Sequence, residues 1–593
     1  MKKKSGRIAA VLLSVILCCC SPGKTPSEKL YANFDNDLDI LISANDNFLE
    51  FVKQKQDSLS LRREFLKLRL LFKKTEAFSE YFTPSTVKLV NGAPLDEIED
   101  EENAVFEPGG LQVIEELVYA AEPADQEELV RQVRKMQVNV KRIKSLWKDI
   151  RITDSHIFDA WRLEMFRMIT LGISGFDTPA SGNTLDEAGV VLASFSEFLD
   201  VYKAILPGYA RLTSQTKAAA DFLKKGKSFD DFDRAAFIKD YINPICREFH
   251  QNQKLAAIPF IRDYKLLNGE AVTLFDVDAF DAESLVSNPA FKSTADRVAL
   301  GRKLFFDPRL SGDGKTSCGS CHQPELAYSD GLKTSKGFAR DHVSRNAPTL
   351  AYAALQQALF YDLRSPSLED QAADVIHNKD EMHGSLADIA RLLGSDEDYR
   401  QYFRKAFPKM DSIRAVYVQN ALASFVRSLS PFNSAFDKYM RGDARALTDN
   451  QVKGFNLFMG KARCGTCHFM PLFNGTVPPD YQRTESEVLG VTVRADWEHP
   501  VLDPDAGRGA HNRFPQWKNS FKTSTIRNIT KTSPYMHNGA YASLSEVMDF
   551  YNRGGGAGLG LDVPNQTLAP DKLDLSETEI GYVVDFMESL TDQ

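Results

Sequence analysis

The sequence predicts a mainly α-helical protein, in which an N-terminal helical bundle is followed by two smaller helical units. Three observations predict this fold class. Apolar residues in the first half recur at steps of three and four, as on a helix with one buried face. In the second half, helix-capping patterns lie on both sides of a repeated cysteine motif. The alternating patterns that indicate strands are weak throughout.

The bundle is predicted for residues 30 to 270. Its clearest apolar stripe contains Leu129, Val133, Met136, Val140, Ile143 and Trp147. Such a stripe predicts antiparallel helices packed on a common core. The stretch from Gly110 to Glu115 faintly resembles the Gly-x-His-x-x-Glu motif of imelysin-type periplasmic proteins. Gln112 replaces the histidine of that motif, so we carry over no metal site and expect a docking or structural role.

Residues 1–20 have the features of a bacterial lipoprotein signal. Basic residues are followed by the apolar stretch Ile8 to Leu17, which is too short to span a bilayer. The spacing from Leu17 marks Cys20 as the predicted lipidated residue. An ordinary secretory signal with incidental cysteines is the alternative. The lipoprotein interpretation predicts a periplasm-facing protein held to a membrane by its lipid.

Net charge, length and the remaining cysteine give weaker indications of function. The net charge of −9 gives no support for nucleic-acid binding. The length of 593 residues suggests about three or four domains. Cys246 has no partner in the mature chain, and we expect it to be a buried apolar thiol.

A C-x-x-C-H motif occurs twice in the second half. The first copy is Cys318, Cys321 and His322, and the second is Cys464, Cys467 and His468. C-x-x-C-H is a haem-attachment signature, in which both thiols form thioethers and the histidine binds the iron as proximal ligand. A zinc ribbon or a redox dithiol is the alternative, but neither explains a histidine after both pairs. We therefore predict two covalently bound haem c groups.

Each motif lies among predicted helices, as in small c-type cytochromes. The predicted capping pairs are Ser293 with Asp296, Thr448 with Gln451, Ser543 with Glu546, and Ser576 with Glu579. A helix before the motif and another at the end would enclose each haem. We therefore predict a first cytochrome c-like haem domain at residues 285–440 and a second at residues 441–593.

Several further segments of the second half are more specific than the haem motifs. They are Gly301 to Asp307, Leu326 to Gly331, Arg345 to Leu350, Ser367 to Ala372, Glu381 with Met382, Arg527 with Asn528, and Pro534 to Gly539. On these segments, residues 290 to 593 resemble the bacterial di-haem cytochrome c peroxidase family, including its MauG-type members. The resemblance implies a peroxide site at the first haem and electron entry at the second, from a small c-type cytochrome or another redox protein.

The resemblance also implies catalytic residues over the first haem. Glu381 matches the family's acid–base glutamate, and Gln371, ten residues earlier, matches a neighbouring amide of the same pocket. A carboxyl group held there should have a raised pKa through desolvation. A solvated carboxylate is the alternative for Glu381. Arg345 and Arg364 are candidate partners of the haem propionates, or ordinary surface arginines.

A calcium ion between the haems is a further implication of the resemblance. Asn346 matches its side-chain ligand, and backbone carbonyls at Thr532 and Pro534 match two others. These are the hard oxygen ligands that calcium prefers. An ordinary turn residue is the alternative for Asn346.

Three positions depart from the family pattern near the first haem. Tyr361 replaces a tryptophan between the haems, and its oxidation requires loss of a proton, which argues against rapid charge sharing between the haems. Val375 replaces a proline of the distal pocket. His342 is the one histidine in the loop that can block the first iron, but its spacing favours a surface residue.

The sixth ligand of the second haem is predicted less directly. Counting from Ser543, the family position falls on Tyr551, where other members have methionine or tyrosine. Tyrosine ligation favours ferric iron, whereas methionine raises the potential. Met536 and Met548 are rival donors, and a packed aromatic is the alternative for Tyr551.

These residues predict an oxidoreductase that reduces hydrogen peroxide to water at the first haem with electrons delivered through the second. Two alternatives remain open. A MauG-type enzyme would use peroxide to oxidise a partner protein, which Tyr551 favours and Tyr361 disfavours. A non-catalytic electron-transfer lipoprotein would have two closed haems, and would leave Glu381 and Gln371 unexplained.

Overall fold

The computed structural model describes residues 24 to 593, except 56, 100–102, 121–124, 227, 263–265, 339–341 and 513. The predicted signal at residues 1–20, with Cys20, lies outside the described residues. The prediction of a mainly α-helical protein is confirmed, because the described strands form only two short two-stranded sheets. In the described part of the chain, no helix is both long and apolar enough to cross a bilayer.

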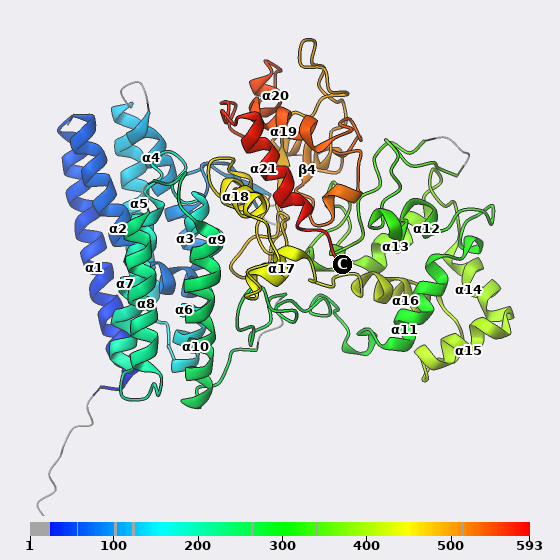
Figure 1. Ribbon diagram of the computed structural model, residues 1–593, viewed down its shortest axis with the longest axis horizontal. Helices are drawn as coiled ribbons and strands as arrows, with labels where there is room; N and C mark the ends of the chain where they lie inside the picture. The colour runs from blue at the N-terminus through cyan, green and yellow to red at the C-terminus, as the bar shows by residue number, and fades with distance from the viewer. Residues whose placement is uncertain are drawn as a thin grey trace, which may run out of the picture.

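The N-terminal bundle consists of upright helices on the left of Figure 1. They are α1 (Pro26–Lys53), α2 (Ser58–Phe82), α3 (Pro84–Asn91), α4 (Leu111–Tyr119), α5 (Gln126–Trp147), α6 (Asp154–Thr170), α7 (Thr184–Tyr202), α8 (Tyr209–Lys225), α9 (Arg234–Ala236) and α10 (Asn243–Leu255). The predicted apolar stripe is the buried face of α5. Strands β1 (Glu97–Glu99) and β2 (Ala104–Phe106) pair antiparallel between α3 and α4, with Glu97 opposite Phe106.

We call α11 to α16 the first haem unit and α17 to α21 the second. The first contains α11 (Ala295–Phe305), α12 (Cys318–Cys321), α13 (Leu368–His377), α14 (Leu386–Ser395), α15 (Glu397–Ala406) and α16 (Ala415–Arg427). The second contains α17 (Ala435–Met440), α18 (Asp449–Phe458), α19 (Leu544–Asn552), α20 (Gly555–Gly558), α21 (Glu577–Glu588), β3 (Ser486–Val488) and β4 (Ser520–Lys522), whose strands pair antiparallel. The second haem unit lies between the bundle and the first haem unit (Figure 1).

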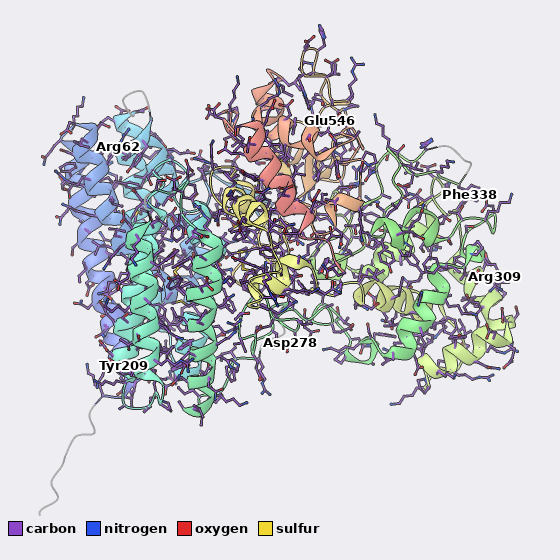
Figure 2. The ribbon with its side chains drawn as sticks, viewed as in Figure 1. Arg62, Tyr209, Asp278, Arg309, Phe338 and Glu546 are labelled. Carbon is purple, nitrogen blue, oxygen red and sulfur yellow. The ribbon has the colours of Figure 1, made fainter. Side chains whose placement is uncertain are left out.

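The predicted capping boxes account for where the helices of the second haem unit begin. Reciprocal side-chain and backbone hydrogen bonds form at Thr448 with Gln451, at Ser543 with Glu546 and at Ser576 with Glu579. Figure 2 labels Glu546 in this unit. The prediction at Ser293 is wrong by one residue. Thr294 caps α11 by accepting a hydrogen bond from the Arg297 amide, because Thr294 is the last residue with extended backbone.

In each haem unit two helices cross in close contact, and a glycine lies at the crossing point. A Cβ added at Gly301 of α11 would lie 1.9 Å from the Ala421 carbonyl oxygen of α16. A Cβ added at Gly454 of α18 would lie 1.8 Å from the Tyr582 carbonyl oxygen of α21. The two units therefore enclose their motifs in the same way, with helices so close that only glycine fits at the crossing.

The bundle and the second haem unit share one continuous apolar core, whereas most of the first haem unit packs on a core of its own. Hydrogen bonds also connect the bundle to the second haem unit. The Ala235 amide donates to Asn456 Oδ1 at 2.9 Å, and Asn456 Nδ2 donates to Asp233 Oδ1 at 3.0 Å. Since Asn456 lies on α18, just before the second motif, the bundle docks directly beside that motif.

Helix α17 also packs on the second haem unit. Phe436 contacts the ring of Phe455, and Asp437 forms a buried ion pair with Arg527 at 2.7 Å. The structure therefore groups α17 with the second unit, so the division between the units falls before the predicted boundary at residue 441.

The crossing of α18 and α21 generates a stability prediction. Gly454→Ala should lower the free energy of unfolding by about 2 kcal/mol or more, because the methyl group forces the two backbones apart. Calorimetric melting of the haem-loaded protein measures this change. The matched control is Gly581→Ala on α21, where an added Cβ meets nothing within 4 Å. It should be neutral or stabilise by about 0.5–1 kcal/mol, and equal melting temperatures for the two variants would contradict the prediction.

Candidate haem and peroxide site

The first motif lies on the short helix α12. A capping box between Ser317 and Ser320 begins the helix, in which Cys318 and Cys321 lie one turn apart. His322 Nδ1 lies 2.8 Å from the Tyr328 carbonyl oxygen. Because a carbonyl only accepts, this contact places the proton on Nδ1 and leaves Nε2 free to bind iron. Desolvation lowers the pKa of His322, which keeps the imidazole in its neutral, iron-binding form.

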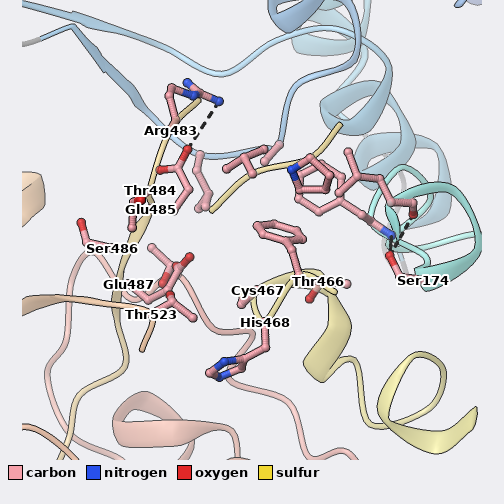
Figure 3. Close-up of a pocket in the computed structure, with 18 of the residues that line it drawn as sticks. Ser174, Thr466, Cys467, His468, Arg483, Thr484, Glu485, Ser486, Glu487 and Thr523 are labelled. Atoms are coloured by element: carbon pink, nitrogen blue, oxygen red, sulfur yellow. Dashed lines mark hydrogen bonds and ion pairs between the residues drawn. The ribbon is translucent and has the colours of Figure 1, made fainter. Parts of the chain in front are cut away.

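The second motif has the same arrangement. His468 Nδ1 lies 3.3 Å from the Phe473 carbonyl oxygen, and desolvation lowers the pKa of His468 to about 4. Cys464, Cys467 and His468 line a cavity of about 2130 Å³. Figure 3 shows Cys467 and His468 at the wall of this cavity. Both motifs therefore fit a covalently attached haem, with two thiols on one side and a neutral, oriented imidazole.

Glu381 lies near the first motif, as predicted. It follows α13 in a tight turn, where Asn378 Nδ2 donates to Glu381 Oε1 at 2.7 Å. Burial raises the pKa of Glu381, which is the expected shift. The Glu381 charge in turn contributes to the raised pKa of Cys321, so the carboxyl group lies within electrostatic range of the haem-attachment site. Gln371 lies half-buried on α13, the helix that precedes this turn.

Tyr551 lies beside the second motif. Burial raises the pKa of the Tyr551 phenol, and the Cys467 and Cys464 thiols act on it in the same direction. The rival donors Met536 and Met548 line the same cavity. The structure therefore brings all three candidate sixth ligands to the second haem site, and the choice of Tyr551 stays a prediction.

The propionate role of Arg345 stays a prediction, and the structure shows which protein groups this side chain bonds. Its guanidinium bonds Asp505 through two nitrogens, at 2.7 and 2.9 Å, and Asp362 through the third at 2.6 Å. Each of its three nitrogens donates to a protein carboxylate. Arg364 also bonds Asp362, at 2.8 Å, and lies over the ring of Phe360. No sequence pattern marks Asp362 and Asp505 as the partners of Arg345. Asp505 lies 160 positions from Arg345, and no spacing rule connects them.

The structure shows the contacts of two further histidines, His537 and His342. His537 stacks on Phe521 with ring centroids 3.6 Å apart, and its carbonyl accepts the Asn346 amide at 2.8 Å. It therefore joins the loop after the first motif to the loop after the second. His342 is exposed, with Nδ1 at 2.7 Å from the Thr334 carbonyl oxygen. The surface interpretation of His342 fits this position.

The predicted calcium ligands lie on one wall of the cavity. Asn346, Thr532 and Pro534 all line it. The Asn346 Nδ2 donates to the Leu332 carbonyl at 2.8 Å, so Oδ1 is the end turned to Tyr361, whose hydroxyl lies 3.4 Å away. Calcium binding stays a prediction. Burial raises the pKa of the Tyr361 phenol, which strengthens the expected tie between its oxidation and loss of a proton.

Two carboxylates at the haem motifs, one buried and one half-buried, were missed. Asp330 is 7% exposed, has Oδ2 unpartnered among the described residues, and acts electrostatically on Cys321 and His322. Glu487 of β3 faces Cys467, and burial raises its pKa. Asp330 belongs to the segment Leu326 to Gly331, which resembles the peroxidase family. No motif or spacing in the sequence pointed to Glu487.

Comparison with known proteins gives the family. The model of the di-haem cytochrome c peroxidase family matches residues 295–445. The methylamine utilization protein MauG of Methylorubrum extorquens is 34% identical over 310 residues, which are 52% of this chain and 82% of that protein. The cytochrome c551 peroxidase of Nitrosomonas europaea is 35% identical, over 44% of this chain and 73% of that protein.

A crystal structure of a MauG-like protein associated with microbial copper homeostasis is 31% identical, with a TM-score of 0.46, over 51% of this chain and 91% of that one. The two C-x-x-C-H motifs, each with an oriented histidine, define the class as a protein with two haem-attachment sites. From the relatives, the chain belongs to the di-haem cytochrome c peroxidase family, which includes MauG, and is an oxidoreductase of the peroxidase class. Membership implies haem c at both motifs.

Covalent attachment can be tested at the second motif. Replacing Cys464 and Cys467 together by serine should leave one covalently bound haem, because serine cannot form the thioethers. Intact-mass spectrometry of the purified protein counts the haems. The control is Cys246→Ser, a 5% exposed thiol of the bundle whose pKa burial raises to about 12, and it should keep both. Two attached haems in the double variant would contradict the assignment.

Proposed function

We propose that the protein reduces hydrogen peroxide to water at the first haem, with electrons delivered through the second. The observation that carries the proposal is the half-buried Glu381 carboxyl group, which lies within electrostatic range of Cys321 of the first motif. When bound, the haems supply the iron that binds peroxide and the electrons that break its O–O bond. The balance is one peroxide, two electrons and two protons to two waters.

Glu381 handles the proton in this reaction. It would accept a proton from one oxygen of peroxide and return it to the other, which would depart as water. Asn378 orients the carboxyl group through Oε1, so the other oxygen is the one directed to substrate. Burial raises the Glu381 pKa towards the working pH, where acid–base exchange is efficient.

The rest of the proposal concerns partners and location. A small c-type cytochrome or another redox protein supplies the electrons. A lipid on Cys20 holds the protein to a membrane, facing the periplasm. The lipoprotein-like features of residues 1–20 support this location, and haem attachment outside the cytoplasm agrees with it.

Substitution of Glu381 tests the catalytic assignment. Glu381→Gln should lower peroxide turnover by about 10²–10⁴-fold, because the amide cannot accept and return the proton. Turnover is measured with an artificial electron donor, and haem content by absorbance. The control is Glu325→Gln, an exposed carboxylate of the same unit, which should keep full activity. Undiminished turnover in Glu381→Gln would remove the residue from the mechanism.

The same carboxyl group predicts a pH profile. A group with a raised pKa is protonated below it and cannot act as a base, so turnover should fall as the pH drops through the Glu381 pKa. The midpoint of this fall should lie at a pH above the usual pKa range of glutamate, and the fall should be absent in Glu381→Gln. If the variant still loses turnover over the same pH range, another group is responsible.

Electron paramagnetic resonance tests whether the first iron is open. Because His342 is exposed and turned to the Thr334 carbonyl, the fully ferric protein should show a high-spin signal beside a low-spin one. Two low-spin signals would mean that both irons are closed. Peroxide binding would then require reductive activation, or the electron-carrier function would replace the peroxidase.

A MauG-type oxidation of a partner protein is the second candidate. The observation that favours it is Tyr551 beside the second motif, since tyrosine ligation stabilises ferric iron. Tyr361 between the haems disfavours it. Peroxide-dependent modification of a co-purified protein in the absence of an electron donor would support this candidate over the first.

A further inference from the structure

The cavity at the second motif contains a half-buried lysine that takes no part in the proton transfer assigned to Glu381. Lys522 is the last residue of β4 and lies opposite Ser486 of β3. It lines the cavity together with Cys467 and His468. Figure 3 shows Thr523, the next residue in the chain, at the same cavity. Lys522 therefore belongs to the wall of the space that receives the second haem.

The ammonium group of Lys522 forms no hydrogen bond and no ion pair with any residue that the structure describes. Burial lowers the pKa of Lys522 to about 8, and the charge of Asp362 opposes this shift without a direct contact. Lys522 Nζ is also absent from the fully enclosed polar atoms that lack a partner among the described residues. The unpaired end of the side chain is therefore accessible, and the cavity is the space that it lines.

The other cations of the cavity wall have partners or are exposed to solvent. Three of them form ion pairs, one stacks on a tryptophan ring, and two are exposed: these are, in turn, Lys88, Arg167 and Arg483; Arg508; and Arg151 and Arg463. Within the described part of the chain, Lys522 is thus the half-buried cation of this wall that lacks a counter-charge. A charge removed from water in this way is stabilised only by an opposite charge or by hydrogen bonds.

The carboxylate that acts on Lys522 is already shared by other cations. Asp362 accepts from Arg345 at 2.6 Å and from Arg364 at 2.8 Å. Arg345 also pairs with Asp505. Two carboxylates therefore serve three permanent cations, Arg345, Arg364 and Lys522, so one positive charge is left over. This group of residues fits an additional anion at Lys522.

We propose that Lys522 binds a propionate of the haem attached at the second motif. A propionate is a carboxylate, and an ammonium group offers it three N–H donors and a full positive charge. The backbone of Lys522 is held for this contact, because its amide donates to the Tyr361 carbonyl at 2.6 Å and β4 is paired with β3. The proposal depends on haem attachment at the second motif and not on peroxide reduction, so it would stand if the protein were an electron carrier.

The charge of Lys522 should also favour the reduced form of the second haem. A positive charge nearby stabilises an electron added to the iron, and the low dielectric of a half-buried site strengthens this effect. Lys522 is cationic at neutral pH, which lies below its pKa of about 8. Removing this charge should therefore make the second haem harder to reduce.

Spectroelectrochemical titration of the full-length, haem-loaded protein at neutral pH tests the charge. Lys522→Met should lower the ratio of reduced to oxidised second haem about tenfold, at the applied potential where the unaltered protein is half reduced. Lys522→Arg should restore the ratio, because arginine keeps the charge. The matched control Lys518→Met removes an exposed lysine of the same unit and should change nothing. Electron paramagnetic resonance of the ferric forms follows the two haems separately.

Resonance Raman spectroscopy tests the bond itself. The propionate bending band of a haem depends on the hydrogen bonds that its propionate oxygens accept, so this band should shift in Lys522→Met and keep its position in Lys522→Arg. A role in folding alone would leave the band unchanged in a variant that holds both haems. Circular dichroism and haem absorbance show that each variant is folded and loaded, and Lys522→Gln is the second neutral variant if Lys522→Met does not load.

A free anion is the competing ligand for Lys522, and sodium acetate is its probe, with sodium chloride as the control for ionic strength. If the propionate occupies Lys522, millimolar acetate should leave the reduction of the second haem unchanged. Three outcomes would overturn the proposal. An acetate effect that is lost in Lys522→Met would assign the lysine to a free anion. An unchanged ratio and Raman band in folded, haem-loaded Lys522→Met, or a change confined to the first haem, would remove Lys522 from the second haem.

Discussion

The apolar core shared by the bundle and the second haem unit is the constraint on which the rest of the structure depends. A helical bundle with its own core would be a separate domain, free to move on a linker. Here one core continues from α1 to α21, and Asn456 joins α18 to the bundle by two hydrogen bonds. The second haem motif is consequently built against the bundle, and the cavity beside it has walls from both.

Burial explains why the charged side chains inside the bundle are paired. A carboxylate or guanidinium removed from water is unstable unless it is paired and hydrogen-bonded. Arg69, Lys73 and Arg167 each meet two or more carboxylates inside the bundle. The Glu115 of the imelysin-like stretch pairs with Arg69 at 3.3 Å, so a cationic side chain of the chain itself now faces this glutamate.

The two haem units are joined both by apolar residues and by polar contacts between loops, since Ala351, Tyr352 and Leu355 of the first unit belong to the same apolar core as the second. Arg345 reaches from the segment after the first motif to Asp505 after the second, and His537 accepts the Asn346 amide. Such contacts set how the two motifs lie relative to each other. Tyr361 belongs to the same group of residues, because its hydroxyl lies 3.4 Å from Asn346 Oδ1.

The sequence by itself determined the helical class, the two haem-attachment motifs, three of the four capping boxes and the buried stripe of α5. These depend on neighbours within about one or two helical turns, so local spacing suffices. Only the tertiary structure decided that Asp362 and Asp505 hold Arg345, that α17 packs on the second haem unit, and that Asn456 of α18 bonds residues of the bundle. Each of these is decided by residues far apart in the sequence, whose meeting follows from how the helices pack rather than from any local pattern.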